Sequence, residues 1–179
     1  MQAQDILHFW FEELSDKQHF TKEPALDAAM RQRFGATLEA AACCELFGWR
    51  GTPQGRLAEI LLLDQFSRNI FRDSARAFAQ DALALVLAQE LVGGEHDLQL
   101  TVQQRAFAYM PYMHSESLRV HGEAVRLFGQ PGLESNLGFA LRHQAIIARF
   151  GRYPHRNVLL GRDSSAEELA FLSEPGSSF

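Results

Sequence analysis

The sequence predicts an all-α fold of stacked antiparallel helical hairpins, with about seven to nine helices in a single domain over residues 1–179. Three observations support this prediction. Leu and Ala together number 47, whereas Val, Ile and Thr number 15, a balance that favours helix over strand. No segment sustains the alternation of apolar and polar residues that is typical of a half-buried strand. The connections are short, so consecutive helices are expected to pack as antiparallel neighbours.

Four expected helices make up the first half of the chain, and residues that favour helix ends mark their boundaries. Proline suits the first turn of a helix, and Pro24 and Pro53 are placed accordingly. Thr52 and Ser74 have hydroxyls that can cap the helices that follow them. The glycine pair at residues 93–94 suits a helix end. These helices are expected to cover about residues 4–14, 24–47, 53–71 and 75–94.

The second half shows similar signals. Thr101 opens the fifth helix, and Pro111 is expected to end or kink it because proline lacks the backbone N–H that a helix uses. Residues 151–163 are expected to form a loop, and the tail from about residue 173 is expected to be flexible. The helices are expected at about 102–116, 116–129, 134–150 and 164–172, the last with overlapping capping boxes (Ser164 with Glu167, Ser165 with Glu168).

Charge and cysteine content limit the classes of function. The net charge is −5 and the pI is about 5.8, which argues against general binding to nucleic acids or to anionic membranes. Neither a signal peptide nor an apolar run long enough to span a membrane is visible. Cys43 and Cys44 are adjacent and unsuited to pairing, so we expect a reduced, cytoplasmic protein. Within an alanine-rich run these two residues fit packing better than catalytic thiol chemistry.

One polar stretch lies in an otherwise apolar helix. In "LLLDQFSRNIFRD", Asp64, Arg68 and Arg72 are four residues apart and are expected on one helical face. Apolar residues cover the other directions, which indicates a buried helix. Buried charges need partners, so we expect Asp64 to pair with an arginine. A structural ion-pair network and a functional polar pocket are both compatible with this pattern.

A second stretch, "YMPYMHSES", places His114 and Glu116 after Pro111. A histidine beside Ser115 suggests a hydrolase, but no GxSxG motif is present and a plain N-cap role for Ser115 or Ser117 explains the serines as well. No HExxH motif or zinc-like Cys/His spacing occurs, so no metal and no cofactor are expected.

The third stretch is basic. Between residues 135 and 162 there is no Asp or Glu. A helix C-terminus favours one or two cations, but it does not account for this number. Either internal acids (Asp64, Glu116 and Asp163 are the candidates) or an anionic ligand must balance the charge, and the planar guanidinium suits both. The cations of this stretch are Arg142, His143, Arg149, Arg152, His155, Arg156 and Arg162.

These three stretches, together with "ILHFWFEE" near the N-terminus, resemble the signature segments of an uncharacterised, mainly bacterial family, domain of unknown function 924. The resemblance covers nearly the whole chain and implies a right-handed superhelix of the tetratricopeptide type. It implies no established reaction. The chain departs from the family's pattern at Ser67, where proline is expected, and this change is expected to loosen the local backbone while leaving the polar residues in place.

We therefore expect the three polar stretches to converge on one site. The leading hypothesis is recognition of an anionic small molecule or an acidic peptide group. The alternatives are a protein–protein interaction module and a hydrolase with His114 or His143 as base. The sequence does not predict an oligomeric state. The predicted site residues are Asp64, Arg68, Arg72, His114, Glu116, His143, Arg149, Arg152, His155 and Arg156.

Overall fold

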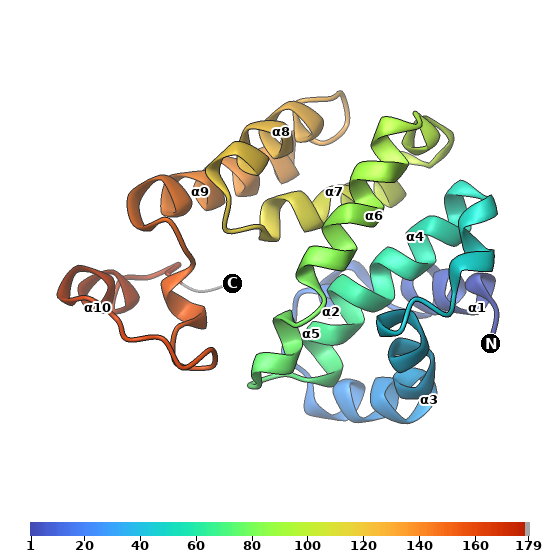
Figure 1. Cartoon of the computed structure of the whole chain (residues 1–179), viewed down its shortest axis with the longest axis horizontal. Coiled ribbons are helices and arrows are strands. Elements are labelled where there is room, and N and C mark those ends of the chain that lie inside the picture. Colours follow the sequence, from blue (N-terminus) through green and yellow to red (C-terminus); the bar gives the residue numbers. More distant parts are fainter. Residues whose placement is uncertain (178–179) are drawn as a thin grey trace.

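The computed structural model describes residues 1–177, and these residues fold into helices, turns and loops without a β-strand. Counting α4 and α5 once, because a π-helical turn joins them without a break, the described residues form nine α-helical elements, in agreement with the predicted number. The α-helices are α1 (Ala3–His8), α2 (Asp16–His19), α3 (Pro24–Ala42), α4 (Pro53–Leu61), α5 (Ser67–Ile70), α6 (Asp81–Gly93), α7 (Val102–His114), α8 (Leu118–Phe128), α9 (Glu134–Phe150) and α10 (Ala166–Leu172) (Figure 1).

The N-terminal half is held together by an aromatic core, defined here as Phe9, Trp10, Phe34, Phe66 and Phe107. The rings of Phe34 and Phe66 lie 5.1 Å apart, and those of Trp10 and Phe66 lie 5.3 Å apart. All five side chains are buried. The core therefore joins α3, α7 and the two π-helical turns Phe9–Glu13 and Leu62–Phe66, which carry the "FWFEE" and "LLDQF" sequences.

The π-helical turn Leu62–Phe66 depends on the backbone of Ser67. The Ser67 N–H donates to the carbonyl of Leu62, which closes the wider ring of a π turn. A proline at this position has no N–H and cannot make that hydrogen bond. Ser67, where the resemblance led us to expect proline, therefore makes a backbone hydrogen bond that proline could not make.

Two predicted boundaries were wrong. Helix α3 ends at Ala42 rather than Phe47, because Cys44 adopts a left-handed conformation with φ of 59°. Ser74 caps a short 3₁₀ turn, Ala75–Phe78, and α6 begins only at Asp81. The helix predicted over residues 102–116 is confirmed as α7, which continues past Pro111 to His114, so of the two expected effects of Pro111 the ending of the helix does not occur. Pro111 is buried in the helix interior, where packing compensates for the missing hydrogen bond.

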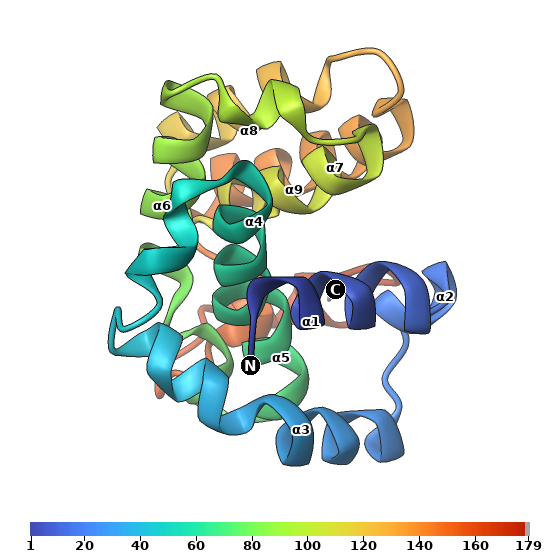
Figure 2. The same cartoon turned by 90° about the vertical axis from the view of Figure 1, so that its right-hand side faces the viewer.

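In the second half of the chain, helices α6, α7, α8 and α9 stack in chain order, and each packs against the next, as the short connections predicted. Figure 2 shows α7, α8 and α9 together at one end of the molecule and α3 at the other, with α4 between them. The superhelical, tetratricopeptide-like arrangement remains a prediction. Within the described residues no helix combines the length and the apolar character that crossing a membrane requires.

The end of α9 and the chain after it form an apolar cluster that is separate from the main core. Ile146, Ile147 and Tyr153 form a small apolar cluster with Phe150 and Phe171. Helix α10 begins with the predicted capping box of Ser165 and Glu168, whereas Ser164 bonds to Asn157 instead. Of the predicted flexible tail, residues 173–177 form hydrogen-bonded turns, and residues 178–179 lie outside the described part of the chain.

Candidate functional site

A pocket lies where the start of α6, the end of α7 and the segment after α9 meet. Its volume is about 350 Å³, which falls within the range of about 300–1,000 Å³ that is usual for small-molecule sites. Its walls are apolar on the α6 side and polar at the end of α7. The lining residues that carry chemistry are Phe78, Asp81, His114, Ser115, Glu116 and Arg156.

His114 is held at this pocket by a carboxylate beneath it. Its Nδ1 lies 2.7 Å from Oδ1 of Asp64, which is fully buried. Since a carboxylate only accepts, Nδ1 carries the hydrogen and Nε2 is left as the acceptor. Nε2 has no hydrogen-bond partner among residues 1–177, and His114 lines the pocket. The imidazole therefore presents an open acceptor to whatever enters.

Electrostatics keep this histidine neutral near pH 7. Burial and the neighbouring Arg68 guanidinium lower the pKa of His114, and together they outweigh the opposite effect of Asp64. Burial raises the pKa of Asp64, but Arg68 and His114 more than reverse this and hold it well below its usual value. The pair is thus a neutral imidazole resting on an ionised carboxylate.

Two arginines balance the carboxylates of Asp64 and Asp81. Arg68 bonds to Asp81 at 2.9 and 3.0 Å and lies 3.1 Å from Asp64. Arg156 donates to Asp81 at 3.0 Å and to the carbonyl of His114 at 3.0 Å. Its guanidinium carbon lies 4.5 Å from the ring centre of Tyr153. Two carboxylates thus face two guanidiniums, and with His114 neutral this group has no net charge.

A second ion pair anchors the segment after α9. The Glu116 carboxylate accepts from Arg162 at 2.7 and 2.9 Å and from the Tyr153 backbone N–H at 2.8 Å. These donors lower the pKa of Glu116 despite its partial burial, which alone would raise it. We call the whole network the polar joint, defined as Asp64, Arg68, Asp81, His114, Glu116, Arg156 and Arg162.

Three further histidines surround the buried ring of Tyr153, behind the pocket. The rings of His121, His143 and His155 lie 6.2, 5.7 and 5.5 Å from it. The hydroxyl of Tyr153 donates to the Met113 carbonyl at 2.5 Å. Burial lowers the pKa of His143 to about 3, and burial together with Arg156 lowers that of His155 to about 4. These histidines are therefore neutral core groups around Tyr153. Among residues 1–177, no three His, Cys, Asp or Glu side chains gather as a metal site requires.

The predicted convergence of the three polar stretches is confirmed. Asp64 and Arg68 come from the first, His114 and Glu116 from the second, and Arg156 from the third, and all five belong to the polar joint. The predicted burial of Asp64 beside an arginine is also confirmed. His143 and His155 lie next to this group, around Tyr153.

Three predicted site residues lie elsewhere. Arg72 bonds to Asp27 at 2.6 and 2.9 Å, because α5 ends at Ile70 and Arg72 has left the helical face of Asp64. Arg149 and Arg152 face α10, where they pair with Glu167 and Glu168.

Of the three acids expected to balance the basic stretch, Glu116 is confirmed by its pair with Arg162, and Asp64 and Asp163 were wrong. Asp163 contributes only its backbone carbonyl, to Arg152, and Asp64 pairs with no arginine of the basic stretch. Asp81, Glu116, Glu167 and Glu168 neutralise four of its five arginines. Helical spacing gives no hint of Asp81, because it begins a new helix at an angle set by the preceding turn. Tyr153, the centre of the histidine group, had no signal beyond its place in "GRYPHRN".

Two comparisons with known proteins match nearly the whole chain. Residues 6–176 match the family described as bacterial protein of unknown function, DUF924. The chain belongs to this family. The solved structure of a protein of unknown function, ATU0120 from Agrobacterium tumefaciens, is 38% identical, with a TM-score of 0.91 over 96% of each chain. Among curated proteins none matches the chain. The chain and the Agrobacterium protein thus have closely similar folds, and neither the family nor this structure assigns a function.

Proposed function

We propose that the pocket at the end of α7 binds a small molecule through an ionised acidic group, and that His114 takes up one proton from solution when that group binds. The observation that carries the proposal is the position of His114, whose Nδ1 is fixed by Asp64 at 2.7 Å while Nε2 remains open at a pocket of about 350 Å³. A bound carboxylate next to Nε2 would complete a chain of carboxylate, imidazolium and carboxylate.

The balance of charge explains why a proton accompanies the ligand. The acids and arginines of the polar joint already neutralise one another, and Asp81 and Glu116 lie at the pocket wall. A bare anion therefore gains little attraction from the empty site. When His114 is protonated, the same site gains one positive charge directly beside the ligand, and the anion raises the pKa of His114 in return.

Calorimetry can test this proton uptake. We expect a small carboxylate such as succinate to bind with uptake of about one proton per site, measured as a difference in binding heat between buffers of different ionisation enthalpy. Affinity is expected to fall about tenfold for each pH unit above the pKa of free His114. His114→Gln is expected to abolish binding. His143→Gln is the matched control, because that histidine is buried next to Tyr153 and does not line the pocket. Binding that is independent of pH, or that survives in His114→Gln, would contradict the proposal.

A second candidate is hydrolysis with His114 as general base. An Asp that fixes the tautomer of a His, whose other nitrogen faces the substrate, is the arrangement that activates a hydroxyl or water. The Asp64–His114 pair has this arrangement. Hydrolysis of p-nitrophenyl esters that is lost in both His114→Gln and Asp64→Asn would favour catalysis over binding alone. The expected interaction-module role remains a prediction.

A further inference from the structure

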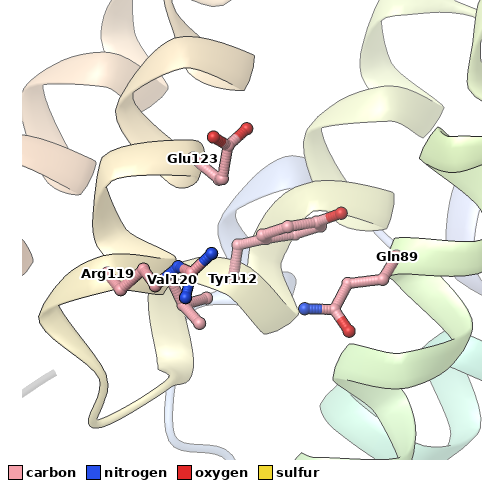
Figure 3. A pocket seen from close by; sticks show the side chains of 5 residues that line it. All are labelled: Gln89, Tyr112, Arg119, Val120 and Glu123. Atoms are coloured by element: carbon pink, nitrogen blue, oxygen red, sulfur yellow. The ribbon is translucent and has the colours of Figure 1, made fainter.

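A second pocket, of about 340 Å³, lies between α6, α7 and the first turns of α8. Gln89, Tyr112, Arg119, Val120 and Glu123 line it. None of these residues lines the pocket at His114. Figure 3 shows the Tyr112 ring in the middle of this pocket, with the Arg119 guanidinium on one side and the Gln89 amide on the other.

Tyr112 is largely buried, but its hydroxyl reaches the pocket. The residue is 5% exposed, and its hydroxyl makes no hydrogen bond to any group within residues 1–177, so this oxygen is accessible at the pocket rather than sealed in the core. The buried tyrosines at positions 109 and 153 both donate, to Asp97 and to the Met113 carbonyl. Burial and the nearby Glu123 raise the pKa of Tyr112 to about 12, so the hydroxyl stays a donor at neutral pH.

Arg119 is also unpaired. Ten of the other fourteen arginines lie within hydrogen-bond distance of a carboxylate, whereas Arg119 contacts none among the described residues. The acid nearest in sequence on its helix face, Glu123, is already bonded to Arg126 at 2.8 Å. Arg119 also lies in the first turn of α8, where the helix dipole favours a bound anion.

We propose that this pocket is a second ligand site, which binds a carboxylate that carries an apolar group. The guanidinium of Arg119, the hydroxyl of Tyr112 and the amide of Gln89 supply hydrogen-bond donors from three helices. The face of Tyr112 and the side chain of Val120 supply an apolar wall for the rest of the ligand. This site differs from the pocket at His114, because its cation is permanent and binding needs no proton.

Benzoate is a suitable probe, since it combines a carboxylate with a flat apolar ring. We expect titration of the full chain with benzoate to produce saturable shifts in the backbone NMR signals of residues 112, 119 and 120, with little change between pH 6.5 and 8. Benzamide, which has the same shape and no charge, is expected to bind at least about tenfold more weakly, because a charge-assisted pair is lost.

Two substitutions test the named donors. Arg119 is exposed, so the Arg119→Gln variant is expected to fold normally. This substitution is expected to weaken benzoate binding about tenfold. Tyr112→Phe keeps the ring and removes only the hydroxyl, and it is expected to weaken binding as well. Arg142→Gln on α9 is the control, because Arg142 packs on the Phe139 ring away from this pocket. His114→Gln is expected to leave benzoate binding at Tyr112 unchanged, which separates this site from the proposed function. The absence of saturable shifts at these residues, or equal binding in Arg119→Gln, would overturn the proposal.

Discussion

The aromatic core and the polar joint share the π-helical turn Leu62–Phe66, yet they stabilise the molecule by different interactions. Phe66, at the end of the turn, packs its ring 5.1 Å from Phe34 in the aromatic core. Asp64, two residues earlier, lies 2.7 Å from His114 in the polar joint. The extra residue in a π turn changes the direction of successive side chains, and such turns are common at functional sites.

The difference lies in how each region tolerates change. Apolar burial in the aromatic core is non-directional and does not depend on pH. Hydrogen-bonded charges in the polar joint need each partner in place, because a single lost partner leaves a buried charge uncompensated. The polar joint also anchors the wall of a pocket, whereas the aromatic core is closed. We therefore expect both regions to contribute to the free energy of unfolding, and only the polar joint to contribute to ligand binding.

The largest effect is expected for Asp64→Ala. The substitution leaves Arg68 short of a buried partner and should reduce the free energy of unfolding by about 3–5 kcal/mol. Phe66→Ala is the apolar counterpart, and a buried phenylalanine also costs about 3–5 kcal/mol. Denaturant unfolding at several pH values distinguishes the two. The cost of Asp64→Ala is expected to shrink as the pH falls toward the depressed pKa of Asp64 in the folded protein, while that of Phe66→Ala stays constant.

An unfolding midpoint of Asp64→Ala equal to that of the parent protein would mean that Asp64 contributes nothing to the joint. A cost of Phe66→Ala that varies with pH would show that the two regions are not independent.

The next effect concerns acid sensitivity. The folded pKa of His143 is about 3, below the value of about 6.5 for an unfolded histidine. The unfolded chain therefore binds more protons between these values, and stability falls as the pH decreases through this window. From pH 6.5 to 4 the loss from His143 alone is expected to be about 2–3 kcal/mol. Chemical denaturation of His143→Gln is expected to show a flatter pH profile, since glutamine cannot be protonated. An unchanged profile would assign the acid sensitivity to other groups.

The smallest effect is expected for Arg162→Ala, which removes the bonds to Glu116 while both side chains are partly exposed. Solvent screening limits the expected cost to about 1–2 kcal/mol. Arg72→Ala is a matched control, because Arg72 makes a similar two-bond contact with Asp27 outside the joint. Hydrogen exchange can separate them. Arg162→Ala is expected to increase exchange at residues 153–162, and Arg72→Ala is not. Equal exchange in both variants would contradict the anchoring role of Arg162.

Local signals in the sequence predicted most of the fold. Pro24, Pro53, Thr52 and the Ser165–Glu168 capping box all mark helix starts, because these residues satisfy or spare the free N–H groups of a first turn. The burial of Asp64 followed from the apolar residues around it. Errors arose where a single residue adopts an uncommon backbone conformation, as Cys44 does in the left-handed region.

What the sequence determined by itself was the helical class, most helix starts and the three polar stretches that meet. Only the tertiary structure decided which acid faces which arginine. The contact between Arg156 and Asp81 joins residues 75 positions apart, and that between Glu116 and Arg162 joins residues 46 apart. Helical periodicity extends over a few turns and contains no information on such pairs. For the same reason the sequence suggested a cationic surplus, whereas the fold brings in acids from α6, from the connection between α7 and α8, and from α10. These acids neutralise most of the surplus and leave His114 open at the pocket.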